Sequence, residues 1–279
     1  MNLEQLAARQ AQLAQSVHIP PLGQGYKPQP GDLIFALDVQ YAGDRACVGV
    51  DVSEWQGRPI NTNHTRGQEK PDRTRCFSQA LGDKSHRPKP LLRDEHNKRD
   101  RSEGFGRTGG FAAAVPVQVP YIPRFFCFRE GPPLLETITA IRERFGLTPE
   151  LILVDGHGIA HPRRFGIACW VGIKTGMPTI GCAKKTLLNY VGEMGKKRGD
   201  SLPIEDQGEV VGDALTTRDN VKPVFVSPGH GINLDTAVEI ILALCKYRIP
   251  DPLRRADQVA RACAKGQIPP GITDLGKLA

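Results

Sequence analysis

The stretch LVDGHGIAHPRRFGIA (residues 153–168) joins a short apolar run to a helix-like segment through one acid, two glycines and two histidines. Apolar residues 151–154 are typical of a central strand in a sheet that is covered on both faces. A turn requires a glycine or two, but it does not require a carboxylate at position 155 followed by a histidine at position 157. We therefore interpret Asp155 as a metal ligand at the end of a central strand.

Strands and helices alternate on either side of this stretch. Residues 33–41 and 46–52 are rich in β-forming residues and flank AGDR, which predicts a hairpin, and residues 111–119 predict a third strand. Apolar spacing then predicts helices over 3–17, 133–146, 163–176, 234–247 and 251–266 and strands over 150–155, 178–183 and 222–231. Three antiparallel strands followed by this alternation predict an α/β fold with a mixed sheet flanked by helices.

The positive charge of the chain is concentrated in one segment. Residues 56–110 contain 13 Lys and Arg against 7 Asp and Glu, a charge of +6 within a total of +7. The segment has few large apolar residues, so it cannot bury enough surface to offset chain entropy. We interpret it as a long disordered insertion in a single domain that spans residues 1–279. The net charge favours an anionic partner.

Cysteine usage and hydropathy indicate the cellular setting. The seven cysteines include no CxxC pair and are odd in number, which argues against a disulfide framework or a structural zinc site. Residues 1–17 lack the apolar core of a signal peptide, and no apolar run approaches the ~20 residues of a membrane span. We expect a cytoplasmic monomer that does not associate with membranes.

Three carboxylates form the first candidate site: Asp38, Glu130 and Asp155. Asp38 lies within an apolar strand, where an unpaired charge is costly to bury, and Glu130 follows FFCFR at the expected start of a helix. If the strands are neighbours, the three acids converge at one end of the sheet. Hard oxygen ligands of this kind bind Mg²⁺ or Mn²⁺. The alternative is that each acid only caps a strand or helix.

Histidines and lysines extend this candidate site. His230 follows a predicted strand and precedes a helix, so we expect it at the same end of the sheet as Asp155, where an imidazole can orient water or act as a base. Lys184 and Lys185 close another strand, and one ammonium could pair with a phosphate or a carboxylate. A turn role for His161 and a solvated helix start for the lysines are the alternatives.

A second unusual stretch is PYIP, formed by Pro120, Tyr121, Ile122 and Pro123. Two prolines make a stiff loop and disfavour a core strand. An aromatic ring presented in this way could insert into a base stack, as side chains do in proteins that deform duplexes, and enzymes acting on a base commonly extrude it. A stiff packing turn is the alternative.

Several motifs together resemble the endonuclease V family of inosine-directed repair nucleases. They are FALDVQY, PYIPRFFCFREGPP, LILVDGHGIAHPRRFGIA, IGCAKK and VFVSPGHGINLDTAV, and the resemblance covers residues 1–55 and 111–265. It implies a ribonuclease H-like fold and Mg²⁺-dependent cutting of DNA, with Mn²⁺ as a substitute. The implied cut is at the second phosphodiester 3′ to deoxyinosine and leaves a 3′-hydroxyl and a 5′-phosphate.

The resemblance also implies roles for individual residues. Asp38, Glu130 and Asp155 match metal-ligand positions, Lys184 a catalytic lysine and His230 a histidine of the active site. The loop Pro120–Pro123 matches a strand-separating wedge, and the inosine pocket would lie around this loop and the backbone near Gly156. Further substrate contacts are expected from Arg129 and His161.

Two departures from the family pattern leave alternatives open. Arg124 follows PYIP where the family usually has glycine, and residues 56–110 stand where the family has a short connection. The segment is either a tolerated insertion or a sign of a damaged gene. Besides DNA repair, two functions therefore stay open: an endoribonuclease acting on inosine-containing RNA, and an inosine-binding protein whose cleavage is impaired by the insertion.

Overall fold

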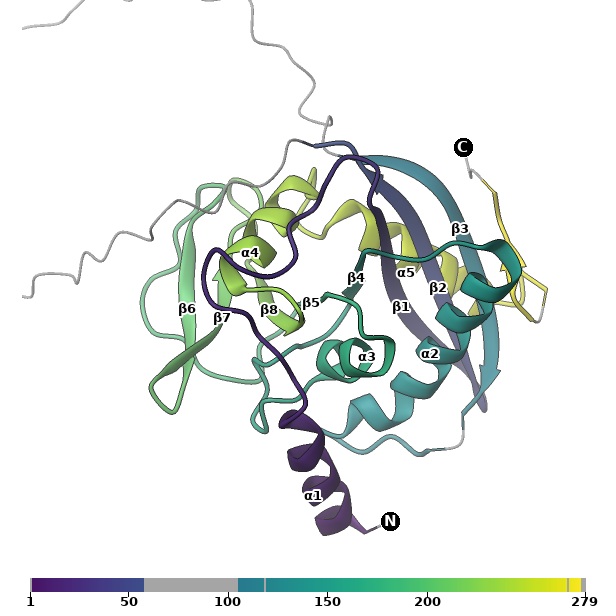
Figure 1. The fold of residues 1–279 in the computed structure, drawn as a ribbon, viewed down its shortest axis with the longest axis horizontal. Helices are drawn as coiled ribbons and strands as arrows, with labels where there is room; N and C mark the ends of the chain where they lie inside the picture. The colour runs from purple at the N-terminus through teal and green to yellow at the C-terminus, as the bar shows by residue number, and fades with distance from the viewer. Residues whose placement is uncertain (1, 58–104, 118, 270, 277–279) are drawn as a thin grey trace, which may run out of the picture.

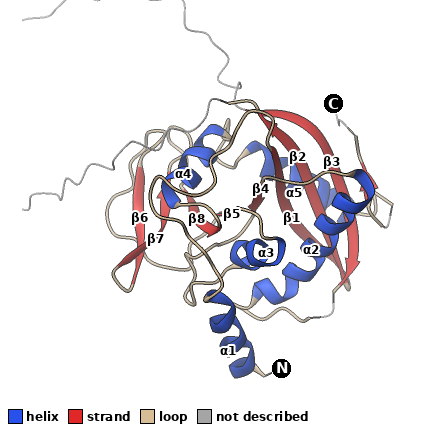
Figure 2. Cartoon of the chain, viewed as in Figure 1, coloured by secondary structure: helices blue, strands red, loops and turns tan. Residues whose placement is uncertain are grey.

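The computed structural model describes residues 2–57, 105–117, 119–269 and 271–276, so most of the predicted insertion lies outside the described residues. The described chain forms one nine-stranded sheet in the order β6-β7-β8-β5-β4-β1-β2-β3-β9, with helices on both faces (Figures 1 and 2). The strands are β1 Leu33–Ala42, β2 Arg45–Trp55, β3 Phe105–Pro116, β4 Leu151–Val154, β5 Thr179–Ala183, β6 Ser201–Asp206, β7 Glu209–Leu215, β8 Val224–His230 and β9 Thr273–Asp274. The helices are α1 Leu3–Ala14, α2 Phe126–Phe145, α3 Ile167–Thr175, α4 Leu234–Ala243 and α5 Asp251–Ala264.

The first three strands form the predicted antiparallel meander. Ala42 pairs with Arg45 across a two-residue turn in which Gly43 has a φ of 60°, a conformation that suits glycine. The predicted start of β3 was wrong, because the strand begins at Phe105 and pairs there with Trp55. Its first residues include Gly106, Gly109 and Gly110, whose low β propensity conceals a strand that pairing with β2 stabilises.

The centre of the sheet is parallel and one of its sides is not. β4 pairs in parallel with both β1 and β5, whereas β8 runs antiparallel to β5. Beyond β8 lies the β6–β7 hairpin, which the sequence analysis did not predict. Buried and exposed side chains do not alternate regularly along these two strands, so the period-2 pattern that predicts a strand is weak in the sequence.

Alternation along β1 divides the core between the two faces of the sheet. Phe35 and Leu37 pack with α2 and α3, whereas Ile34 and Ala36 pack with α4 and α5. Helix α2 begins at Phe126, so the prediction that it starts near Pro133 was wrong and Glu130 lies inside the helix. Packing of this first part of α2 on α3, where Gly131 contacts Trp170, overrides the two prolines.

Helix α5 lies unusually close to the sheet. A Cβ atom on Gly49 would collide with the carbonyl oxygen of Ala256 and would lie 2.6 Å from the Ala260 nitrogen. The contact is secured by a buried ion pair in which Arg255 Nε lies 2.6 Å from Asp51 Oδ1. The absence of a side chain at Gly49 and the ion pair between Arg255 and Asp51 therefore hold α5 close to β2.

Helix α1 confirms the helix predicted at the N-terminus and projects from one end of the domain (Figure 1). Asn2 and Gln5 form a capping box at its start. Only part of one face is buried, notably Leu6 and Gln10. Among the helices of the described residues, none has the length and apolar character needed to cross a membrane.

Candidate active site

Asp38 and Asp155 lie side by side on adjacent parallel strands. The last parallel pair is Leu37 with Val154, each residue just before one of the acids, and the Asp155 amide donates to the Leu37 carbonyl. Both acids lie two residues after a side chain that packs against α4 and α5, so they lie on that face of the sheet. The strand ends therefore bring together two of the three acids predicted from the sequence.

Glu130 approaches from α2 on the other face of the sheet. It is buried, and its Oε1 accepts a hydrogen bond from the Tyr41 hydroxyl at 3.1 Å. Burial raises the pKa of Glu130 well above its usual value, and the charges of Asp38 and Asp155 raise it further against the effect of Tyr41. Burial, followed by the charge of Asp155, raises the pKa of Asp38 to about 7. The three carboxylates are thus close enough to repel one another.

Lys184 partly neutralises this cluster. Its ammonium forms an ion pair with Asp155 Oδ2 from the position that directly follows β5. Burial lowers the pKa of Lys184, but the contact with Asp155 outweighs that effect and the pKa lies above its usual value. The neighbouring Lys185 is exposed, in accord with the solvated position considered for it.

A fourth carboxylate, Asp257 of α5, was missed by the sequence analysis. Gln40 Nε2 donates to Asp38 Oδ2 at 3.1 Å and to Asp257 Oδ1 at 3.2 Å, so one amide bridges the two acids. A signal was present in the sequence, because Asp257 lies four residues after the buried Leu253, on the helical face that packs on the sheet.

The donor set fits a hard divalent cation that keeps part of its water shell. Within the described residues, no three His, Cys, Asp or Glu side chains form a ready-made metal cluster. Mg²⁺, however, usually takes only one or two carboxylates together with water and substrate phosphates. Crowded, buried carboxylates with raised pKa values are stabilised by a nearby cation, and all the candidate ligands are oxygens. Asp38, Glu130 and Asp155 are the residues from which the one or two carboxylate ligands of such an ion would come.

The predicted position of His230 was wrong. Because β8 runs antiparallel to β5, His230 pairs with Thr179 at the start of β5, whereas Asp155 lies level with the end of that strand. His230 is therefore at the opposite end of the sheet from the acids. Its Nδ1 accepts a hydrogen bond from the backbone amide of His18 at 3.2 Å, which ties down the segment after α1.

A pocket of about 230 Å³ opens beside the acidic cluster. Its lining brings together three residues predicted to bind substrate, Tyr121, Gly156 and His161, and adds Gln10, Arg124 and Phe165. Pockets for drug-sized ligands usually exceed about 300 Å³, so this one suits a smaller group. Its walls are mainly apolar, and Gly156 and His157 line it on the side next to Asp155.

Glycine is required where the pocket backbone meets the sheet. A Cβ atom on Gly158 would collide with the carbonyl oxygen of Pro228, and one on Gly181 would lie 2.5 Å from the Gly158 nitrogen. The Gly158 amide donates to Ser227 Oγ at 2.8 Å. The glycines of the DGHG segment therefore let the chain after Asp155 lie directly on β5 and β8.

The loop of residues 119–125, here called the Tyr121 loop, forms one rim of the pocket. Tyr121 is 62% exposed and contacts the Phe126 ring edge-on, with centroids 6.0 Å apart. Arg129 does not line the pocket, since its guanidinium lies over the Tyr41 ring and donates to the Val119 carbonyl at 2.9 Å. It therefore supports the loop from behind, while Pro120 and Pro123 are exposed and Ile122 is half-buried.

The fold is shared with solved structures of endonuclease V proteins. The Streptomyces avermitilis endonuclease V superimposes with a TM-score of 0.68 at 30% identity, over 96% of this chain and 95% of that one. A Ciona intestinalis endonuclease V, solved in complex with a 24-mer DNA containing an inosine followed by a ribo-adenosine, has a TM-score of 0.67 at 23% identity, over 95% and 100% of the two chains. The chain is thus an α/β protein of the architecture that these nucleases have.

Sequence comparison gives the family. The family model described as Endonuclease V matches residues 110–258, and the Nocardia farcinica endonuclease V is 50% identical over 151 residues. That match covers 54% of this chain and 65% of the relative, so it spans just under two thirds of the relative's length. The chain belongs to the endonuclease V family.

Proposed function

We propose that this protein is a metal-dependent endonuclease that cuts DNA near deoxyinosine. One observation supports this most directly: Asp155 belongs to the acidic cluster, and the next residue, Gly156, lines the pocket. A base extruded into the pocket would carry its own phosphodiesters toward the carboxylates. The names of the relatives, and the inosine-containing DNA held by the Ciona intestinalis protein, agree with this proposal.

The side chains of the site have separate tasks in this proposal. Asp38, Glu130 and Asp155 would hold Mg²⁺, or Mn²⁺ in its place, which when bound supplies an activated water and neutralises charge on the phosphate. Lys184, already paired with Asp155, adds a positive charge beside the phosphate. Tyr121 would fill the space that the extruded base leaves, and so offset part of the unstacking cost of a few kcal/mol.

The position of the cut follows from the resemblance rather than from the geometry. We propose cleavage of the second phosphodiester 3′ to deoxyinosine, leaving a 3′-hydroxyl and a 5′-phosphate. The test uses end-labelled strands of one sequence, made as DNA and as RNA, each with inosine or adenine at one position. The products are sized beside chemical ladders, with Mg²⁺, Mn²⁺ or chelator present.

The outcomes of this assay, read with binding of the same strands, distinguish a DNA endonuclease, an endoribonuclease and a binding protein. Nicking of inosine-containing DNA that chelator abolishes supports the proposal, and preferential cutting of the RNA strand would replace it with an endoribonuclease. Inosine-dependent binding without any cut in either strand would mean that the protein is a binding module.

A further inference from the structure

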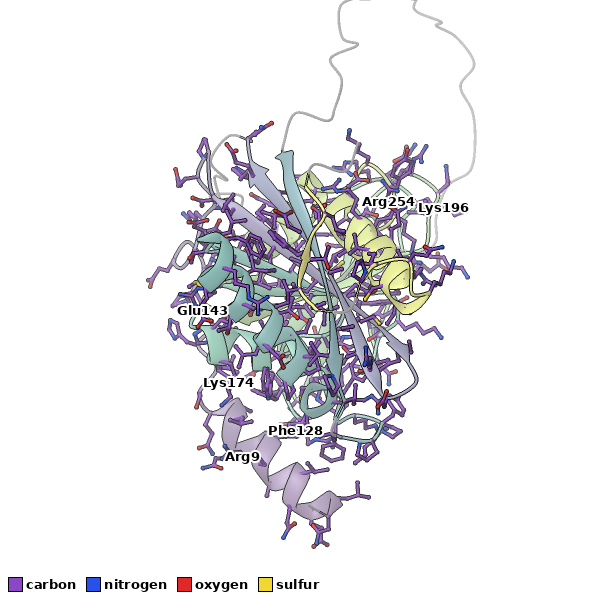
Figure 3. The ribbon with its side chains drawn as sticks, turned by 90° about the vertical axis from the view of Figure 1, so that its right-hand side faces the viewer. Arg9, Phe128, Glu143, Lys174, Lys196 and Arg254 are labelled. Atoms are coloured by element: carbon purple, nitrogen blue, oxygen red, sulfur yellow. The ribbon has the colours of Figure 1, made fainter. Side chains whose placement is uncertain are left out.

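Helix α1 contributes one fully buried polar side chain, and it reaches the rim of the pocket. Gln10 is 0% exposed although α1 projects from the body of the domain, and the adjacent Arg9 points to solvent (Figure 3). Burying a side-chain amide without hydrogen-bond partners is costly, so the partners of Gln10 indicate the role of its burial.

Gln10 contacts both walls of the pocket opening. Its Nε2 donates to the Phe165 carbonyl at 2.7 Å and lies 3.4 Å from the Arg124 carbonyl, and its Oε1 accepts from Arg163 Nε at 2.5 Å. Arg163 Nη2 in turn donates to the same Arg124 carbonyl at 2.8 Å, and the guanidinium of Arg163 stacks on the Phe125 ring, 4.1 Å from its centroid. One amide and one guanidinium thus converge on a single backbone carbonyl.

The carbonyl that they hold belongs to a strained residue. Arg124 has a φ of 68°, in the left-handed region that is unfavourable for residues other than glycine. Such a conformation persists only where its surroundings over-determine it. The other end of the Tyr121 loop is held by Arg129 at the Val119 carbonyl. The loop is therefore fixed at both ends, with the exposed ring of Tyr121 between them.

We propose that Gln10 is a positioning residue that fixes the Tyr121 loop for base recognition by holding Arg163 and the Arg124 carbonyl. This inference rests on the proposed function for its effect on cleavage, but not for its effect on the loop. Without Gln10, the Arg163 side chain loses its neighbouring acceptor and residue 124 is free to leave the left-handed region. Substrate binding must then order the loop, which weakens binding more than it slows the chemical step.

Trypsin measures the loop directly, because the Arg124–Phe125 peptide bond is both its cleavage site and the bond that Gln10 helps to hold. Proteolysis under mild conditions follows the population of the open form. Gln10→Leu should speed the cut after Arg124 by about tenfold or more, the equivalent of removing a hydrogen bond to a charged group. Gln10→Glu keeps an acceptor for Arg163 and should restore part of the protection.

The matched control is Gln12→Leu, the same substitution at an exposed position of α1 where the side chain accepts a hydrogen bond from Arg9. It should leave cleavage after Arg124 unchanged. Cleavage after Lys174, at the end of α3 on the body of the domain, serves as the internal reference. Equal acceleration at both bonds would mean general unfolding and would overturn the proposal, as would an effect of Gln12→Leu equal to that of Gln10→Leu.

Kinetics give the second readout. For Gln10→Leu we expect KM for inosine-containing DNA to rise about tenfold while the single-turnover rate at saturation stays within about threefold. A fall in that rate with unchanged KM would contradict a positioning role. If the wild-type protein does not nick inosine-containing DNA, the proposed function fails, but the trypsin experiment still decides whether Gln10 holds the loop.

Discussion

Lys184, directly after β5, forms an ion pair with Asp155, directly after β4. The pair joins two parallel strands at the end where the carboxylates gather. It places one positive charge against a cluster in which burial and mutual repulsion raise the pKa values of Asp38 and Glu130. Any account of the chemistry must therefore treat the ammonium and the acids as one electrostatic unit.

Asp155→Asn and Glu130→Gln should each lower nicking of inosine-containing DNA by at least about a hundredfold, because an amide is a much weaker ligand for Mg²⁺ than a carboxylate. Binding of the same DNA in Ca²⁺ should survive, since the pocket is lined by other groups. Glu136→Gln, on the exposed side of α2, is the control and should be silent. Near wild-type nicking by Asp155→Asn would show that the site is wrongly placed.

Tyr121→Ala should weaken discrimination between inosine and adenine more than it weakens general DNA binding. Stacking of a base on an aromatic ring is worth roughly 1–3 kcal/mol in proteins that bind single strands. Competition binding in Ca²⁺ with inosine-containing and undamaged duplexes measures the two effects. The control is Tyr247→Ala, since Tyr247 is also exposed but lies against Arg254 and Arg218 instead of the pocket. Equal losses on both duplexes would show that the loop only packs.

Arg255→Met should lower the free energy of unfolding by about 3–5 kcal/mol, because it removes the cationic partner of the fully buried Asp51 carboxylate. Replacing both partners, as Asp51→Leu with Arg255→Met, should restore much of that loss, since apolar side chains leave no charge to desolvate. Urea unfolding midpoints of the single and double variants test this. A single variant as stable as wild type would mean that water compensates Asp51.

The stability of the protein should fall in acid partly through His161. Burial, then the charges of Arg163, His157 and Arg124, lower its pKa from 6.5 to about 4, and its Nδ1 accepts from the Arg163 amide. The unfolded state binds a proton first, so this contribution is complete above pH 6.5 and is lost as the pH falls toward 4. It should amount to roughly 2–4 kcal/mol. Urea unfolding of wild type and His161→Gln at pH 7.5 and 4.5 isolates it, and parallel losses in both proteins would refute it.

Deleting residues 56–104 should leave the fold and the chemistry intact. Trp55 and Phe105 are paired neighbours, so an Asn-Gly turn can join them as an ordinary hairpin. The deletion removes 12 Lys and Arg against 7 Asp and Glu. For every DNA phosphate that the segment neutralises, its removal should flatten the slope of log affinity against log salt by about 0.9.

The deletion variant also tests the alternatives for this segment. DNA-binding titrations from low to moderate salt give the slope of log affinity against log salt, and a nicking assay gives the rate of cleavage. An unfolded deletion variant would show that the segment belongs to the domain, and faster nicking would show that it obstructs the site.

Local sequence singled out Asp38 and Asp155, because a charged side chain inside or at the end of an apolar strand is costly to bury. It predicted that Asp38 and Asp155 would meet only if their strands are neighbours, and the parallel pairing of β1 with β4 meets that condition. It could not predict the direction of β8, which depends on the long connection through β6 and β7. The expected place of His230 was wrong for that reason.

Asp257 was missed for a related reason. The helical pattern of α5 was recognised, but which strand it would cover was not, so nothing tied this acid to Asp38. Gln10 shows the same limit, because one glutamine among the three of α1 has no local mark of burial. Both residues act through contacts more than a hundred positions away along the chain.

Gly49 contains no group that could take part in a reaction, yet it lies opposite Asp38 in the neighbouring strand. A single methyl group there would push the backbone of α5 outward at Ala256. Asp257 is the next residue and would move with it, away from the amide of Gln40 that ties it to Asp38. The distance between Asp38 and Asp257 thus depends on the absence of a side chain at Gly49 in β2. A mutation search limited to polar residues would overlook this position.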